Sequence, residues 1–493
     1  MFVVLLGMAS GSLKRSLGMA RHRTGLVDSG RLEWLDPGAP GLFRKGSSTM
    51  KTHLTLRLAL AVMVGLCACV TGRAALRAGC AKVDITPPLG LKLIGSQGKP
   101  SDSVLDELYG RALVLCDGAN TVAIVSVDLL YSPLEEITNP VRALVAERVG
   151  IPEQNVMVCA THTHSGPDIF TNAKLPLESR IAPEDIDQAY VHTVVGRLAS
   201  AVQMAHRDMQ GARIGAARGE LPEVQYNRRP RRPDGQVQMA FTLPPEITAT
   251  RRIEVGADGR TRVTFTMPPE QADLTFGPID PAVSVLRVED PNGRIIGSLF
   301  AFGCHPVCVY PHRSTTISAD YPARAMRVVE QAEGGISLFT LGLAGDTVPI
   351  RRDVGPCEQI GKALGAEVLR RLQLVATTDD VTLAARRCAL TLATKDTPPQ
   401  EITTEIQVLR LGDVYILGLP GEILVEVGLA IRDKAGIDKL FVTSMTNDSI
   451  GYVCHAEAYT EGAYEPVRGT HLAPGAGEAV ITRALALLAE IQP

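Results

Sequence analysis

Short apolar runs with the two-residue period of β-strands alternate along this chain with longer runs that have the 3.6-residue period of amphipathic helices. Turn-forming residues join two pairs of apolar runs, at 290–293 and at 412–413, and these turns predict two β-hairpins. Strands that alternate with helices are typical of an α/β fold with mixed β-sheet layers and flanking helices. No internal sequence repeat is evident after residue 75.

The predicted strands are 122–130, 156–160, 282–288, 295–302, 336–343, 404–411, 414–419 and 440–445. The predicted helices are 140–149, 184–205, 319–333, 357–372, 422–435 and 475–491.

The apolar run 156–160 leads directly into a His-Thr-His sequence. Alternate residues of a strand share a face, so His162 and His164 are expected to point the same way. Gly166 and Pro167 then end the strand. Two imidazoles at one strand end indicate a metal site, or a general base beside one. The alternative is a pair of hydrogen-bonded histidines at a strand end.

Two other predicted strands also end in loops with an unusual polar residue. His305 follows the strand 295–302, and Glu422 follows the strand 414–419 at the expected first turn of a helix. Sites in α/β sheets assemble outside the carboxyl ends of strands, so His162, His305 and Glu422 are expected to converge. Two neutral imidazoles and one carboxylate are a zinc-binding set that leaves a position open for water. The alternatives are a capped strand end for His305 and a charge favoured by the helix dipole for Glu422.

The amino-acid composition indicates which kinds of binding partner to expect. The chain has 493 residues, is 45% hydrophobic and 21% charged, and carries a formal net charge of −3, which gives no reason to expect nucleic acid as a partner. A basic, proline-rich loop at 227–235 is interpreted as an anion or substrate contact, or alternatively as a solvated loop. Aromatic residues make up 4% of the chain, which argues for a soluble substrate over a membrane-facing surface.

The N-terminal region has the pattern of an export signal. Residues 1–49 show no clear apolar period and are interpreted as translated upstream sequence. A basic stretch from Met50, an apolar run at 58–70 and small residues at 72–74 predict a signal peptide over 50–74. A membrane anchor, or a lipid attached to Cys69, is the alternative. Residues 75–493 are therefore expected to form an exported hydrolase domain, periplasmic or extracellular, whose eight cysteines are mostly buried thiols with one or two bridges.

Four segments, in this order, resemble the signature segments of the neutral/alkaline non-lysosomal ceramidase family. They are 160–167, which contains His162 and His164, 302–307, which contains His305, 419–422, which ends at Glu422, and the tyrosine-containing stretch 447–465. The resemblance runs from about Ala78 to the C-terminus.

The resemblance implies a role for each matched residue. It implies zinc ligation by His162, His305, Glu422 and Tyr452, and a proton shuttle or oxyanion partner at His164. It also implies a hydrogen bond from Tyr464 to the substrate carbonyl or to the tetrahedral intermediate. Asp128, which ends the apolar run 122–127, is interpreted as a residue that orients a ligand histidine, or alternatively as a strand-end cap.

The chain also departs from the family pattern. Val348 occupies the position of a serine that the family uses in catalysis, and Thr347 is one residue out of register. A mechanism that needs this serine is therefore not expected, whereas a zinc–water mechanism is. The family's small C-terminal β-sandwich is not matched, so its substrate and membrane contacts are not expected to transfer intact.

The sequence thus predicts an exported zinc-dependent hydrolase that cleaves an amide bond through a metal-activated water, with ceramide-type N-acyl sphingoid lipids as default substrate. The alternatives are a zinc esterase or amidase acting on a non-lipid sugar or cell-wall substrate, and a non-enzymatic binding protein with structural zinc. The expected partner is a small-molecule or lipid substrate.

Overall fold

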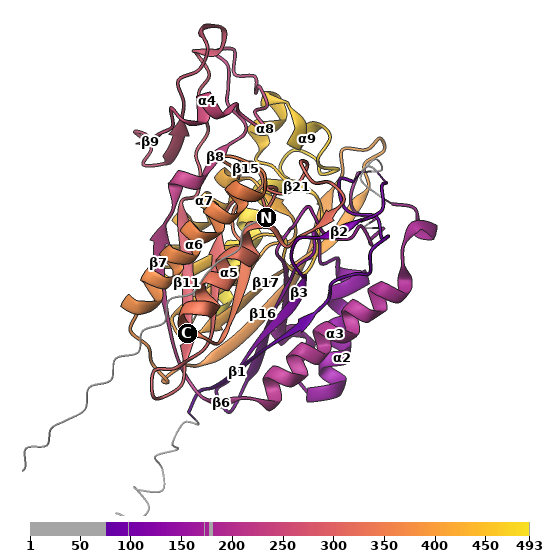
Figure 1. Cartoon of the computed structure of the whole chain (residues 1–493), viewed down its shortest axis with the longest axis vertical. Coiled ribbons are helices and arrows are strands. Elements are labelled where there is room, and N and C mark those ends of the chain that lie inside the picture. Colours follow the sequence, from indigo (N-terminus) through magenta and orange to yellow (C-terminus); the bar gives the residue numbers. More distant parts are fainter. Residues whose placement is uncertain (1–74, 97, 172, 177–180, 493) are drawn as a thin grey trace, which may run out of the picture. The chain divides into compact units, whose positions relative to one another are not determined.

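The computed structural model describes residues 75–492 except 97, 172 and 177–180 (Figure 1). The predicted leader (1–49) and signal peptide (50–74), with Cys69, lie outside the described residues, and export remains a prediction. None of the helices within the described ranges combines the length and apolarity needed to cross a bilayer. The eight described cysteines are free thiols, and five of them are buried.

Three mixed sheets form the centre of the fold. In spatial order, the first sheet consists of β5 (Val156–Ala160), β4 (Thr121–Val127), β3 (Tyr109–Cys116), β1 (Arg77–Asp84) and β6 (Gln210–Gly211). The second consists of β14 (Ile336–Leu341), β12 (Ile295–Phe302), β11 (Ala282–Glu289) and β7 (Arg213–Glu220). The third consists of β16 (Leu383–Ala393), β17 (Glu401–Leu411), β18 (Val414–Gly418) and β20 (Leu440–Thr443).

Helices and four two-stranded ladders complete the described chain. The helices are α2 (Asn139–Val149), α3 (Gln188–Arg207), α4 (Pro245–Thr248), α5 (Asp320–Glu333), α6 (Val354–Leu374), α7 (Val425–Ala435), α8 (Ala456–Glu461), α9 (Tyr464–Val467) and α10 (Ala476–Ile491). The ladders pair β2 (Ser103–Val104) with β13 (Thr316–Ile317), β8 (Gln225–Asn227) with β15 (Thr347–Pro349), β9 (Arg252–Val255) with β10 (Thr261–Thr264), and β19 (Glu422–Ile423) with β21 (Tyr452–Val453). A π turn lies at Leu134–Thr138, and 3-10 turns lie at Glu153–Asn155, Pro183–Asp185, Pro222–Val224 and Pro269–Gln271.

The three sheets share one topology. In each, two neighbouring antiparallel strands (β3–β4, β11–β12 and β17–β18) are followed by a helix and then by a strand that pairs in parallel with the second of them. A further helix packs against the first, so the helix pairs are α2–α3, α5–α6 and α7–α10. Figure 1 labels the first two pairs. The described chain therefore contains the same unit three times, although no repeat is evident in its sequence.

Apolar packing explains why these strands are apolar along their whole length. Leu113 of β3, Leu299 of β12 and Leu409 of β17 lie in one buried cluster to which all three sheets contribute. The helix pairs cover other faces of the sheets, as Leu198 of α3 and Leu487 of α10 show. Strands covered on both faces need apolar residues at successive positions, so β4, β5 and β12 show no alternation of buried and exposed positions.

The predicted α/β class, with mixed sheets and flanking helices, is confirmed, and so are both hairpins. Helix boundaries differ by up to four residues: α3 begins at Gln188 where residue 184 was predicted, and Glu422 lies in β19 while α7 begins three residues later. Strands β1, β3, β7 and β16 were not predicted. In β16 most side chains are at least partly exposed and two adjacent arginines interrupt the apolar pattern, so the strand lacks the signal that identifies a buried one.

Candidate metal-dependent active site

Each of the three residues predicted to converge follows a strand that belongs to a parallel pair, β4–β5, β12–β14 or β18–β20. His162 follows β5 of the first sheet, His305 follows β12 of the second, and Glu422 follows β18 of the third. The loops that carry these three residues meet in one place. The histidine cluster and Glu422 are in contact there, as expected for sites at the carboxyl ends of strands.

His162 lies in a loop and not in a strand, which corrects the prediction from strand alternation. It is two residues beyond β5, with a positive φ of 67° that a non-glycine residue adopts at a cost of about 1–3 kcal/mol. Its N–H donates to the Leu129 carbonyl at 2.9 Å, and its Nδ1 lies 2.9 Å from the Leu130 carbonyl oxygen. The turn brings His164 beside it, with the two Nε2 atoms 3.4 Å apart. The two histidines therefore do point to one place, but the loop puts them there.

Glu422 lies between two of the histidines. Its Oε2 atom is 2.9 Å from Nε2 of His305 and 3.4 Å from Nε2 of His162. Strand β19 holds it there by pairing with β21, in which Glu422 is opposite Tyr452. The residue before it must be glycine, because Gly421 has a φ of 150° and a Cβ there would lie 2.6 Å from a backbone carbonyl oxygen.

The hydrogen bonds of His305 indicate that a cation fits this cluster. Its Nδ1 lies 3.1 Å from the Thr347 carbonyl oxygen, so the ring carries a proton on Nδ1. Burial, and then the Arg228 charge, lower the pKa of His305 to about 4, so at neutral pH Nε2 has a lone pair. That lone pair lies 2.9 Å from a carboxylate oxygen of Glu422, so the two atoms can ligate the same divalent cation. Nε2 of His162 faces the same oxygen while its Nδ1 faces a carbonyl, so it repeats the arrangement.

His164 and Tyr464 border the cluster on the cavity side. The His164 ring stacks on Tyr310 with centroids 5.7 Å apart, and burial, then His162 and His305, hold its pKa well below the usual range. Tyr464 opens α9 and its ring meets Tyr452 edge-to-face at 5.6 Å. Burial and then the Glu422 charge raise the pKa of Tyr464 to about 12. At neutral pH His164 is therefore a neutral base and Tyr464 a protonated donor.

Arg228 was not among the predicted site residues. It is buried, and its Nη2 donates to the Tyr452 hydroxyl at 3.1 Å while its Nε donates to Glu465 at 2.8 Å. Arg229 donates to the other oxygen of Glu465. The solvated-loop interpretation is therefore wrong for these two arginines. The anions that this loop contacts include the protein's own carboxylates. Because Glu465 is far from the loop along the chain, the sequence near the arginines does not reveal this pairing.

Asp128 lies outside the histidine cluster. Its Oδ2 accepts from the Tyr109 N–H at 2.8 Å and from Arg111 Nη1 at 2.7 Å. The ring nitrogens that were expected to need it bond instead to the carbonyls of Leu130 and Thr347. Asp128 follows β4 as His305 follows β12, but Arg111 on the adjacent strand holds the carboxylate, so the structure supports the cap interpretation.

A cavity of about 650 Å³ opens onto the cluster. Its polar lining includes His164, His305, Glu422, Tyr452 and Tyr464. The apolar part of the lining consists of Ile94, Leu130, Ile181, Phe241, Val307 and Pro311. A cavity with apolar walls and reactive groups at one end suits a substrate with a hydrocarbon segment.

Val348 does not line this cavity. It pairs with Tyr226 between β15 and β8, and it is fully buried in an apolar cluster with Phe276. At the position that carries a serine in the resembled family, this chain therefore has a valine that packs in an apolar cluster and offers no hydroxyl nucleophile.

We expect Val348→Ser to lower the free energy of unfolding by about 1–3 kcal/mol, because a hydroxyl would be buried among apolar groups. The variant should not gain hydrolytic activity. Thermal denaturation, with the exposed Val255→Ser as control, checks the first part, and kcat/KM for an N-acyl amide checks the second. A rise in kcat/KM would show that the serine position still faces the reaction.

Taken together, the structure defines an α/β protein with three histidines and a carboxylate at the end of a half-apolar cavity, an arrangement suited to a divalent metal ion. Residues 76–232 match the family described as neutral/alkaline non-lysosomal ceramidase, N-terminal. The resemblance predicted from the sequence motifs is thereby confirmed.

Curated relatives and solved structures agree. The chain is 23% identical over 253 residues to a neutral ceramidase of Mycobacterium tuberculosis, and 24% identical over 221 residues to neutral ceramidase B of Dictyostelium discoideum. These matches cover 50% and 42% of this chain but only 34% and 26% of the relatives. The fold matches neutral ceramidase from Pseudomonas aeruginosa with a TM-score of 0.65 and 19% identity, over 84% of this chain and 74% of that one. A structure titled as a ceramidase complexed with C2 matches equally well, with a TM-score of 0.65, 18% identity, and 84% and 75% coverage.

Proposed function

We propose that this protein is a zinc-dependent amidohydrolase that cleaves ceramide-type N-acyl lipids. The observation that carries the proposal is the neutral His305 Nε2 facing the Glu422 carboxylate at the end of the cavity. The matches to neutral ceramidases supply the substrate class, and the apolar walls offer space for an acyl chain.

Each residue of the site has a separate role in the proposed reaction. His162, His305, Glu422 and Tyr452 would hold the ion. When bound, the ion supplies Lewis-acid polarisation and a water acidic enough to ionise near neutral pH. His164, kept neutral by burial, accepts the proton of the attacking water and returns it to the leaving amine. Tyr464, which keeps its proton, donates a hydrogen bond to the carbonyl oxygen as negative charge develops on it.

Water is the nucleophile in this proposal because Val348 offers no hydroxyl and lies in a separate apolar cluster. Because Val348 replaces the serine of the resembled family, a second candidate function is a zinc esterase or amidase for non-lipid acyl compounds. A non-enzymatic protein with structural zinc is less well supported, because His164 and Tyr464 stand beside the cluster in an open cavity, where a structural site needs neither.

The proposal is tested by fatty acid release from N-dodecanoylsphingosine, N-dodecanoylethanolamine and a dodecanoyl ester, with the purified chain loaded with zinc. Hydrolysis of the sphingosine amide supports the proposal, whereas release of acetate from a water-soluble acetyl ester or N-acetyl sugar, with no dodecanoate released, supports the second candidate. If a preparation with one zinc per chain released neither dodecanoate from any of the three lipids nor acetate from the water-soluble substrates, both hydrolase assignments would be abandoned.

A further inference from the structure

One arginine in the site cavity has no carboxylate partner among the described residues. Arg352 lines the cavity together with His305, Tyr452 and Tyr464. Its Nη2 donates to the Phe241 carbonyl at 2.6 Å, whereas its Nε is buried and has no hydrogen-bond partner. The groups that most affect its charge are Tyr226, Arg228 and two cysteines, and no carboxylate is among them.

Three other arginines, from the loop at 227–235, are paired differently. Arg228 and Arg229 share Glu465, and Arg231 donates to Glu461 at 2.6 Å. Two carboxylates line the cavity, and both have other partners. Glu422 contacts the histidines, and Lys92 is the charged group that acts on Asp168. Nothing in the described chain therefore compensates the charge of Arg352.

An uncompensated guanidinium in a cavity wall is unfavourable until an anion joins it. Burial, and to a lesser degree the Arg228 charge, lower the pKa of Arg352 from its usual value, which shows that the protein does not stabilise this charge. A guanidinium presents several N–H donors in one plane, and this geometry matches the oxygens of a carboxylate or a phosphate. A ligand with such a group in the cavity would bring the guanidinium the counter-charge that the described chain does not provide.

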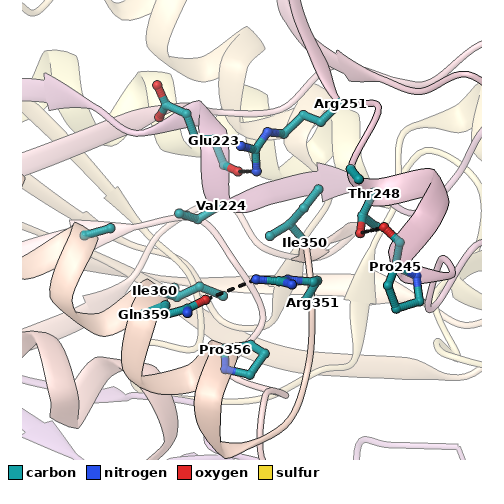
Figure 2. Close-up of a pocket in the computed structure, with 12 residues that line it drawn as sticks. Glu223, Val224, Pro245, Thr248, Arg251, Ile350, Arg351, Pro356, Gln359 and Ile360 are labelled. Atoms are coloured by element: carbon teal, nitrogen blue, oxygen red, sulfur yellow. Dashed lines mark hydrogen bonds between the residues drawn. The ribbon is translucent and has the colours of Figure 1, made fainter.

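The adjacent arginine differs and provides a control. Arg351 lines a second cavity, of about 440 Å³, together with Ile350 and Arg251, and its Nη2 donates to Gln359 Oε1 at 3.1 Å (Figure 2). Arg351 is not part of the site-cavity lining. Two successive arginines therefore carry the same charge into different cavities, and only Arg352 reaches the reactive one.

We propose that Arg352 binds an oxyanion of the substrate, so that the preferred substrates are N-acyl amines with a carboxylate or phosphate close to the scissile amide. This inference rests on the proposed function and refines its substrate class. The apolar walls take the acyl chain and the guanidinium takes the anionic end.

Two matched pairs of substrates test the inference on the full zinc-loaded chain. N-dodecanoylglycine against N-dodecanoylethanolamine tests a carboxylate, and ceramide 1-phosphate against ceramide tests a phosphate. We expect wild type to have the higher kcat/KM for the anionic member of at least one pair. Arg352→Met should lower that preference by at least about tenfold, because a group built to bind the oxyanion is lost. Arg352→Lys should restore part of it, and Arg351→Met should leave it unchanged.

A preference that Arg352→Met leaves intact, or that Arg351→Met lowers equally, would overturn the inference. A wild type that prefers both neutral members would overturn it as well. If zinc-loaded wild type hydrolyses no amide, the proposed function fails by itself, and calorimetric binding of N-dodecanoylglycine then decides the inference. Binding at least about tenfold weaker in Arg352→Met would uphold it, whereas equal affinities or no binding to wild type would refute it.

Discussion

Replacing His164 with glutamine is expected to lower kcat/KM for an N-acyl amide by roughly 10²- to 10⁴-fold, the range for loss of a positioned general acid–base group. The imidazole is the group best placed to move protons, because its Nε2 is 3.4 Å from that of His162 and burial keeps it neutral. Glutamine has similar polarity but cannot accept and return a proton at neutral pH. Steady-state kinetics on the zinc-loaded variant measure the effect.

Two controls separate proton transfer from other effects of this substitution. His192→Gln, on the exposed face of α3, should have wild-type kinetics. Elemental analysis of His164→Gln should still find about one ion per chain, because the four proposed ligands are intact. A variant that lost both metal and activity would make His164 a ligand and would reassign its role.

Glu465→Gln is expected to lower the free energy of unfolding by about 3–5 kcal/mol. The carboxylate is fully buried and accepts from both Arg228 and Arg229, so the substitution leaves Arg228 without a hydrogen-bonded carboxylate and Arg229 with Glu461 alone. Because Arg228 also donates to the Tyr452 hydroxyl, metal affinity should fall as well. Denaturant titration followed by circular dichroism gives the change in stability.

The control for this variant is the exposed Glu457→Gln on α8, which should change stability by no more than about 0.5 kcal/mol. Equal stabilities of the two variants would contradict the account, because they would show that the buried pair of arginines does not depend on Glu465.

The sequence was sufficient to predict the α/β class and the convergence of His162, His305 and Glu422. Fully apolar runs mark strands covered on both faces, and the ends of such strands are where sites form, so both inferences follow from local pattern. The same reasoning did not predict β16, which is half exposed, and it placed Glu422 in a helix although its two-residue strand is set by pairing with Tyr452.

The remaining site features depend on contacts between distant residues. Arg228 is buried only because Glu465, far along the chain, neutralises it, and Arg352 faces the cavity while Arg351 does not. Asp128 follows β4 of the first sheet just as His305 follows β12 of the second. It is not part of the site, because Arg111 on the adjacent strand β3 forms an ion pair with it. The threefold repetition itself is a matter of strand order and helix packing, which leaves no repeat evident in the sequence.

The measurement that tests the central claim most directly is the metal content of the full purified chain by elemental analysis, beside His305→Ala. The account predicts about one zinc ion per wild-type chain and near-complete loss in the variant, because the substitution removes a ligand that faces Glu422. A wild type that takes up no divalent metal, or a variant that retains it unchanged, would contradict the proposed metal site and the hydrolase function built on it.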